Sequence, residues 1–370
     1  MKVPSAALRR LEPLARESAR QGVPLYVVGG CVRDWLLGRS TQDIDLAVEG
    51  EAAPFARAAL RLWGGSMEEF GRFGTVRVKL KDGLRVDFAR TRAESYSESA
   101  ALPRVRPAGI EEDLGRRDFT VNAMALRLGV DGAEPVDPHG GRRDLEARLL
   151  RVLHPASFED DPTRLFRAAR YAARFGLEVE AGTRELIGAA VERRRAELLS
   201  RERVRAELLR LLEEKDPSPA FALLEDWGLL AAFHPRLRWS KTAASARDAG
   251  VRLGLLALSL GEEGPEFVRS LRLERARAGD LLAALKTAAA RRSCVQPLPA
   301  LAREVLARGL DGLPPAALEP LLVGGEDLRA LGLAPGKEYA RLLGEAAEAQ
   351  WKGAFKTKAA ARRWLKMRLA

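Results

Sequence analysis

The chain has 370 residues, 46% of them hydrophobic, so it can bury several cores and form two to four domains. The 62 Lys and Arg residues outnumber 51 Asp and Glu, and the net charge of +11 favours a polyanionic partner such as nucleic acid. With 2 cysteines and 3 histidines, a disulfide scaffold, a four-cysteine zinc site and a histidine-built metal centre are excluded. No apolar run approaches the ~18 residues of a membrane span, and the N-terminus lacks a secretory signal. We therefore expect a cytoplasmic protein without membrane attachment.

The first 150 residues alternate short strand-like runs with helical stretches. The first 22 residues have the spacing of an amphipathic helix, and helical spacing recurs after each of the first two predicted strands. The predicted strands are residues 24–30, 43–50, 75–83, 84–90 and 122–129. This pattern predicts an α/β head, residues 1–150, with a mixed sheet of about five strands.

From about Asp144 onward the pattern is helical, with apolar residues three and four apart and frequent Pro and Gly between the runs. We expect an all-α remainder that is divided into residues 151–215, 216–295 and 296–370. The last 22 residues hold seven Lys or Arg and no acid. This basic end is either a solvated helix face or a tail that contacts nucleic-acid phosphates.

The first motif is a glycine turn between a predicted strand and a predicted helix. Gly29 and Gly30 end the strand, and the helix begins at once. Glycine lets backbone amides approach a phosphate closely, and the start of the helix adds partial positive charge. Gly30 and Arg33, with its forked donors, are therefore candidates for binding a triphosphate, although such a turn also occurs for purely structural reasons. No GxxxxGK[ST] is present, so this is not a P-loop.

The second motif is a pair of carboxylates, Asp43 and Asp45, at the start of a predicted strand. Residues two apart on a strand point to the same face, so the two like charges would repel unless a cation lies between them. Mg²⁺ prefers such oxygen ligands and shares its coordination shell with nucleotide phosphates. The sequence thus predicts a magnesium site, although a lone DxD also occurs in surface turns and in glycosyltransferases.

A third carboxylate, Asp87, lies in the predicted strand 84–90. Phosphoryl transfer with two metals needs ligands shared between the ions and an acceptor for the proton of the attacking hydroxyl. Asp87 is our candidate for either role. The alternative is a structural ion pair with Arg85 or Arg90.

The glycine turn from Gly29 to Asp34 and the pair Asp43 and Asp45 together resemble the bacterial class II tRNA nucleotidyltransferase and poly(A) polymerase family. The resemblance continues, in the family's order, through residues 116–125, 137–145, 160–170 and 202–207. It implies a head with the nucleotidyltransferase sheet of the polymerase-β type, followed by a neck, a body and a basic tail that binds tRNA. It also implies transfer of C or A from CTP or ATP to the 3′ acceptor end of tRNA, without a nucleic-acid template.

Asp161 and Arg164 resemble the family's pair for recognising the nucleotide base. Three residues apart, they would share one face of a helix over residues 160–170. A carboxylate only accepts hydrogen bonds and a guanidinium only donates them, so together they match the amino group and ring nitrogen of cytosine or adenine. Uracil and guanine present the opposite pattern and would be rejected. An ordinary surface ion pair is the alternative.

Three further arginines follow from the resemblance. Arg117 lies in the segment 116–125 and is expected to contact the nucleotide, whereas Asp118 and Asn122 are expected to anchor that turn. Arg167 and Arg170 continue from Arg164 at three-residue steps. They would reach the sugar or triphosphate, or would instead pair with acids of residues 202–207.

Residues 92–106 fall where the family has a flexible loop, and their presence favours addition of CCA or of the terminal A. A solvated connector is the alternative. The sequence does not separate a CCA-adding enzyme from a CC-only or A-only enzyme or a poly(A) polymerase. From other classes, a DxD glycosyltransferase and a non-catalytic RNA-binding protein remain as alternatives.

Overall fold

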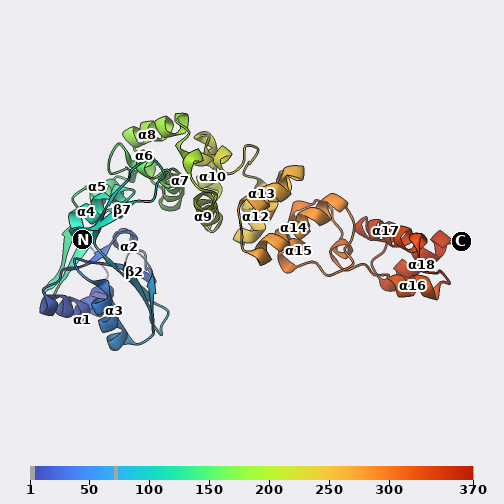
Figure 1. Cartoon of the computed structure of the whole chain (residues 1–370), viewed down its shortest axis with the longest axis horizontal. Coiled ribbons are helices and arrows are strands. Elements are labelled where there is room, and N and C mark those ends of the chain that lie inside the picture. The colour runs from blue at the N-terminus through green and yellow to red at the C-terminus, as the bar shows by residue number, and fades with distance from the viewer. Residues whose placement is uncertain (1–4, 71–73, 370) are drawn as a thin grey trace. The chain divides into compact units, whose positions relative to one another are not determined.

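The computed structural model describes residues 5–70 and 74–369. The chain divides between Leu199 and Ser200 into two compact units. The first contains the main β-sheet, and the elements described in the second are all helical (Figure 1). The division into four parts at about 150, 215 and 295 stays a prediction.

The main sheet is mixed, as predicted. Strands β2 and β5 are parallel, whereas the other neighbouring pairs are antiparallel. Among the described residues it has seven strands, in the order β3-β4-β5-β2-β1-β8-β9. Their bounds are β1 Leu25–Val28, β2 Asp43–Val48, β3 Ser66–Phe70, β4 Thr75–Lys79, β5 Arg85–Arg90, β8 Ala125–Gly129 and β9 Gly132–Val136.

The sequence predicted about five strands and missed the two strands at the edges of the sheet, β3 and β9. β3 has the sequence SMEEF and β9 the sequence GAEPV, and both are largely exposed. Neither has the alternation of apolar and polar residues that marks a half-buried strand, because an edge strand can be held by backbone hydrogen bonds alone. The five predicted strands correspond to β1, β2, β4, β5 and β8.

The sheet has two unlike faces. On β2, the buried Ile44, Leu46 and Val48 point to an apolar face that is covered by helices α1 (Ser5–Gln21) and α3 (Ala52–Trp63) (Figure 1). The alternate residues point to the other face. There, one end is closed by an apolar cluster around helix α4 (Ile110–Gly115), and the other end carries the carboxylates. The cluster comprises Tyr26, Val28, Ala47, Ile110, Leu114, Ala123 and Ala125.

The first unit also contains elements outside the main sheet. A separate hairpin is formed by β6 (Arg92–Ser95) and β7 (Arg104–Pro107). A two-stranded parallel ladder, β10 (Leu149–Leu150) with β11 (Glu178–Val179), interrupts the predicted all-helical segment. The helices are α2 Gly30–Leu36, α4 Ile110–Gly115, η2 Thr120–Asn122, α5 Gly141–Glu146, α6 Ser157–Asp160, α7 Thr163–Phe175, α8 Ala181–Glu192 and η3 Arg195–Leu198.

The second unit is built of short helices, as the apolar spacing predicted. Their bounds are α9 Arg201–Leu212, α10 Ser218–Asp226, η4 Leu229–Ala232, α11 Lys241–Ser245, α12 Ala249–Ser259, η5 Gly261–Glu263, α13 Gly264–Ser270, α14 Arg275–Ala290, α15 Ala300–Gly309, η6 Pro315–Leu318, α16 Gly325–Ala330, α17 Lys337–Trp351 and α18 Lys358–Leu369. In the part of the chain that the structure describes, no helix combines the length and apolarity needed to cross a bilayer.

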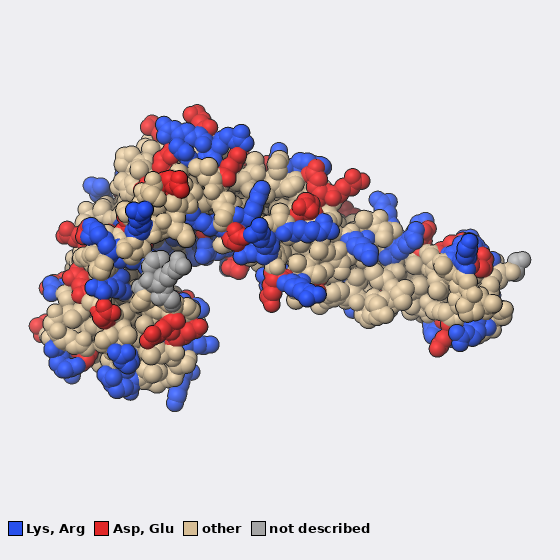
Figure 2. Space-filling view, viewed as in Figure 1, with Lys and Arg blue, Asp and Glu red and all other residues tan. Residues whose placement is uncertain are grey.

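The basic C-terminal segment is folded rather than a bare tail. Leu342, Phe355 and Leu365 belong to a small core of its own. Part of its positive charge is neutralised within the second unit, because Arg362 donates to the Asp327 carboxylate at 2.7 Å. On the face shown in Figure 2, basic and acidic residues alternate over the surface of the second unit. A role of the segment in binding tRNA stays a prediction.

Arg252 fastens helix α12 to the end of helix α9. Only 2% exposed, it donates to the carbonyls of Leu212 at 2.6 Å and Glu214 at 2.7 Å, and also to those of Lys215 and Ala246. We expect Arg252→Met to leave these carbonyls unsatisfied and to destabilise the second unit by about 3 kcal/mol. Thermal unfolding checks this, with Arg308→Met as the control because Arg308 forms an exposed ion pair with Glu304. Equal melting temperatures for the two variants would contradict the assignment.

Candidate active site

The glycine turn forms as predicted between β1 and α2. Gly29 has φ 69° and ψ −131°, a conformation that only glycine adopts easily, and helix α2 begins at Gly30. The Gly29 N–H donates to the carbonyl of Met124 at 3.0 Å, which ties the turn to the segment before β8. A Cβ atom on Gly29 would lie 2.4 Å from Nη1 of Arg117. Because Gly29 has no side chain, the Arg117 guanidinium can pack directly against the turn.

We expect Gly29→Ala to lower the catalytic efficiency by at least about tenfold, because the new methyl group displaces Arg117, and to cost about 1–2 kcal/mol of stability. Gly38→Ala is the matched control. Gly38 has a similar φ of 70°, but a Cβ there meets no atom within 4 Å. It therefore places an alanine at a similar positive φ without displacing a side chain. Steady-state kinetics and thermal unfolding of both variants separate the two effects, and equal catalytic losses would contradict the role of Arg117.

The three predicted carboxylates lie on one face of the sheet. Asp43 and Asp45 are both exposed and alternate with buried residues on β2. In the parallel pairing of β2 with β5, Asp45 lies opposite Asp87 and Asp43 lies opposite Arg85. Register partners in a ladder point to the same side, so Asp87 joins the other two. The sequence predicted the three residue types, and the pairing of the strands brings them together.

Two of these carboxylates have arginine partners. Asp43 forms an ion pair with Arg85. Asp87 accepts two hydrogen bonds of 2.7 Å from Arg77, its register partner on β4. The alternative partners considered for Asp87, Arg85 and Arg90, were therefore wrong. Arg77 could not be identified from the sequence, because the pairing of β4 with β5 decides it.

Asp45 is the carboxylate whose charge is least balanced. Among the described residues none forms an ion pair with it. Its side chain reaches solvent, yet the protein atoms crowded around the carboxylate raise the pKa of Asp45 by desolvation. Arg117 and Arg77 oppose this rise, whereas Asp87 and Asp43 add to it. This excess of negative charge would be relieved by a bound cation.

The oxygen-only donor set of Asp43 and Asp45 fits a hard divalent cation such as Mg²⁺. Within residues 5–70 and 74–369, however, no group of three or more acidic, histidine or cysteine side chains is arranged to hold a metal. Two carboxylates alone are a partial coordination shell. Such a shell suits a cation that also binds nucleotide phosphates.

Arg117 lies beside both the turn and the carboxylates. Its Nη2 donates to Asp113 at 3.0 Å, while its Nε is buried without a hydrogen-bond partner. Desolvation of Asp113 opposes ionisation, but Arg117 and Arg116 hold its pKa below the ordinary value. Asp113 was missed in the sequence, where it reads as a surface acid of a helix. The position of Arg117 fits the predicted contact with a nucleotide.

Arg33 is placed differently from what the motif suggested. It is 4% exposed, and its guanidinium donates to Asp34 at 2.8 Å and to Asn122. It also lies over the ring of Phe175, 4.0 Å from the centroid. These contacts hold α2 against α7. Direct contact of Arg33 with a phosphate stays a prediction, as does that of Gly30.

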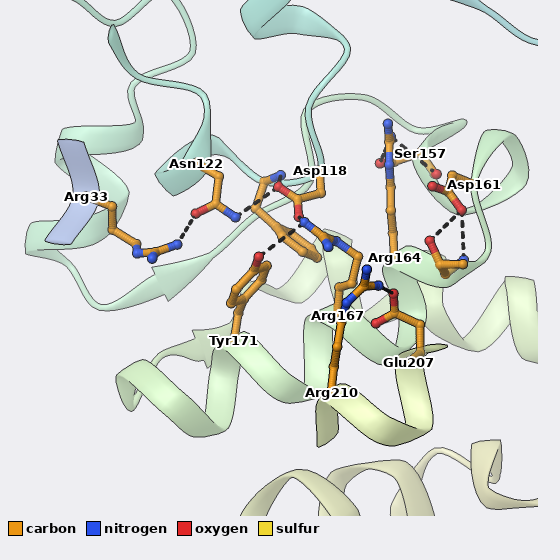
Figure 3. Close-up of polar contacts among 12 residues, drawn as sticks. Arg33, Asp118, Asn122, Ser157, Asp161, Arg164, Arg167, Tyr171, Glu207 and Arg210 are labelled. Carbon is orange, nitrogen blue, oxygen red and sulfur yellow. Dashed lines mark hydrogen bonds and ion pairs between the residues drawn. The ribbon is translucent and has the colours of Figure 1, made fainter. Parts of the chain in front are cut away.

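A continuous chain of hydrogen bonds runs from Arg33 to helix α7 (Figure 3). Asn122 accepts from Arg33 and donates to Asp118 at 2.9 Å, and Arg167 donates to Asp118 at 2.6 Å. Burial would raise the pKa of Asp118, but Arg167 and these hydrogen bonds lower it. Asp118 and Asn122 thus act as anchors of the turn, as predicted. The guanidinium of Arg167 is held by its ion pair with Asp118.

Arg170 is buried and lies over the ring of Tyr171, 4.6 Å from the centroid. The acids considered as alternative partners for Arg167 and Arg170 have contacts inside the second unit. Glu202 pairs with Arg272 at 2.6 Å, and Glu207 pairs with Arg210. Contact of Arg167 or Arg170 with the sugar or triphosphate stays a prediction.

The recognition segment differs from the prediction in one respect, because Asp161 is not helical. Its φ of −137° and ψ of 93° are extended, and helix α7 begins at Thr163. Pro162 disfavours the α conformation for the residue before it, so a shared helix face for Asp161 and Arg164 was wrong. Asp161 accepts hydrogen bonds from the Thr163 backbone and hydroxyl. Arg164 donates to Ser157 and to the Arg116 carbonyl. Figure 3 shows Asp161, Arg164 and Ser157 gathered at the start of this helix.

The segment predicted as a flexible loop is the hairpin β6–β7 with its connection. Ser99 in the connection donates to the carbonyl of Glu159 in α6 at 2.6 Å. Tyr96 donates to Glu94, and desolvation together with the charges of Glu94 and Asp161 raises the pKa of Tyr96 to about 12, against the effect of Arg164. The segment is therefore docked beside the recognition residues, and Tyr96 was missed as a neighbour of the site.

Two family profiles match the chain. The Poly A polymerase head domain covers residues 25–151, and the probable RNA and SrmB-binding site of polymerase A covers residues 176–239. The first range includes the glycine turn, the three carboxylates and Arg117. The second range begins directly after helix α7.

Curated relatives and a solved structure extend the similarity. The chain is 39% identical over 236 residues to the A-adding tRNA nucleotidyltransferase of Geobacter sulfurreducens, covering 64% of this chain and 27% of that protein. It is 36% identical over 336 residues to the CC-adding tRNA nucleotidyltransferase of Deinococcus radiodurans, covering 90% of this chain and 86% of that protein. The Thermotoga maritima CCA-adding enzyme complexed with tRNA superposes with a TM-score of 0.69 at 26% identity, over 100% of this chain and 97% of that one. The chain spans 20% to 52% of the length of three A-adding relatives.

Proposed function

Since the chain belongs to the tRNA nucleotidyltransferase family, we propose that it adds C, A or both to the 3′ end of tRNA. The substrates are CTP and ATP, pyrophosphate leaves, and no nucleic-acid template takes part. We also infer that the protein acts in the cytoplasm. The observation that carries the proposal is the alignment of Asp45 with Asp87, beside Arg117 and the Gly29 turn, on one face of the sheet.

Asp43 and Asp45 would hold a divalent metal ion, and we propose Mg²⁺. When bound, it would lower the pKa of the attacking 3′-hydroxyl and neutralise the leaving pyrophosphate. The negative charge gathered at Asp45 supports this assignment. Asp43 also forms an ion pair with Arg85. Because this pair is exposed, it is weak, and a bound cation with its triphosphate would displace Arg85 from Asp43.

The remaining groups bind and orient the substrates. Arg117 and the turn at Gly30 face the triphosphate, and Asp87 serves as a shared ligand or as acceptor of the hydroxyl proton. Arg77 fixes the orientation of Asp87 through two hydrogen bonds of 2.7 Å. In-line attack of the RNA 3′-oxygen on the α-phosphorus forms the new phosphodiester bond as the bond to pyrophosphate breaks.

Asp161 and Arg164 select the base. The acceptor of one and the donors of the other complement the amino group and ring nitrogen of cytosine and adenine. Although Asp161 precedes the helix, both residues lie at its first turn, and each is held by a neighbouring hydroxyl. The selection therefore depends on groups fixed by the protein.

Two narrower activities each have support. Addition of CC alone is favoured by the Deinococcus relative, which is matched over 86% of its length. Addition of the terminal A is favoured by the similarity to A-adding enzymes and by the docked β6–β7 hairpin. The same matches disfavour a DxD glycosyltransferase and a non-catalytic RNA-binding protein.

The experiment is an incorporation assay with three tRNA substrates, one lacking CCA, one ending in C and one ending in CC. CTP and ATP are given separately and then together. We expect incorporation on at least one of these ends, with the pattern of ends identifying CC, A or CCA addition. Absence of incorporation on all three ends would contradict the proposal, and turnover of UDP-sugars without RNA would support the glycosyltransferase.

A further inference from the structure

Two buried hydroxyl groups flank the residues proposed to read the base. Ser157, the first residue of α6, is 0% exposed, and Thr163, the first residue of α7, is 7% exposed. Asp161 and Pro162 connect these two helices, and Figure 3 shows Ser157 and Asp161 near Arg164.

Ser157 contacts both reading residues. Its Oγ accepts a hydrogen bond of 2.7 Å from Nη1 of Arg164, and its carbonyl accepts the Asp161 N–H at 3.3 Å. The Arg116 carbonyl accepts from Nη2 of the same guanidinium at 2.7 Å. Because a guanidinium is planar, acceptors at both terminal nitrogens fix the plane in which its remaining N–H groups point.

Thr163 does the same for the carboxylate. Its Oγ1 donates to Oδ1 of Asp161 at 2.6 Å, and its backbone N–H donates to the same oxygen at 3.0 Å. With Oδ1 held by two donors, the direction of Oδ2 is defined. The extended backbone at Asp161, imposed by Pro162, makes this turn possible.

We propose that Ser157 and Thr163 are positioning residues for base selection, Ser157 acting through Arg164 and Thr163 acting through Asp161. The inference rests on the proposed function and adds to it the residues that set its accuracy. A flexible arginine rejects a wrong base only if it cannot swing to meet it, so discrimination requires both groups to be held in place. Loss of either hydroxyl removes one of the contacts that hold a reading group, and the remaining contacts then hold it less firmly against uracil or guanine.

The test compares Ser157→Ala and Thr163→Val with Thr163→Ser, which keeps the hydroxyl. kcat/KM is measured separately for CTP, ATP, UTP and GTP on the tRNA end that the wild type extends. For Ser157→Ala and Thr163→Val we expect the preference for the correct nucleotide to fall by about tenfold, the equivalent of about 1.4 kcal/mol. Thr163→Ser should retain the preference to within about threefold.

Ser18→Ala is the matched control, because it removes a buried serine hydroxyl of the same unit that donates to the Val23 carbonyl and contacts neither reading residue. A variant that merely folds less well loses activity with all four nucleotides in proportion, so its preference is unchanged. Unchanged preference in both Ser157→Ala and Thr163→Val, or an equal loss in Thr163→Ser, would overturn the inference. A wild type that incorporates no nucleotide would instead contradict the proposed function.

Discussion

Asp45→Asn is expected to lower nucleotide incorporation by at least ~10³-fold while leaving the fold equally stable or more stable. The change removes a negative charge but almost no volume. Burial and the neighbouring Asp87 and Asp43 already raise the pKa of Asp45, so the folded state holds this charge at a cost. A residue that contributed only to structure would give the opposite stability result.

Single-turnover incorporation and thermal unfolding measure the two effects. Asp82→Asn is the matched control, since Asp82 is an exposed carboxylate of the same unit that pairs with Arg10 at 2.7 Å. It should incorporate nucleotide at the wild-type rate. Near-normal incorporation by Asp45→Asn would remove the carboxylate from the reaction.

Arg164→Ala is expected to reduce use of CTP and ATP by ~10³-fold and to change use of UTP and GTP far less. The wild-type guanidinium donates where cytosine and adenine accept, and its donors are held by Ser157 and the Arg116 carbonyl. Removal of the side chain deletes the favourable contact with the correct bases and also the mismatched contact with the wrong ones. The ratio of the four kcat/KM values is therefore the informative quantity.

Arg174→Ala serves as the control for this variant. Arg174 belongs to the same helix α7 but is exposed. Its removal should leave the nucleotide preference unchanged. An Arg164→Ala enzyme that keeps the wild-type ratio would show that base selection depends on other groups.

The central strands and the glycine turn could be predicted because their signals are local. Alternating apolar residues mark β2, and two glycines after an apolar run mark the turn that follows β1. The edge strands β3 and β9 carry no such alternation. Each is held by the strand next to it in the chain, β3 by β4 and β9 by β8, through backbone pairing that leaves no mark in the side-chain pattern.

The residue types of the candidate site were predictable, but their partners were not. Arg77 meets Asp87 only through the register of β4 with β5, and Arg33 is buried because α7 packs over it. The non-helical Asp161 did have a local signal, since a residue before proline avoids the α conformation. Ser157 had none, because its contact with Arg164 depends on how α6 meets α7.

The metal site is tested by a crystal structure of the protein with CTP and Mn²⁺, in which anomalous scattering locates the metal. We predict Mn²⁺ within direct coordination distance of the Asp43 and Asp45 carboxylates and of the triphosphate. Arg117 and the Gly29 turn should then lie against the phosphates, with Asp43 released from Arg85. Metal or CTP bound away from this face of the sheet, with the Asp43–Arg85 pair intact, would contradict the account.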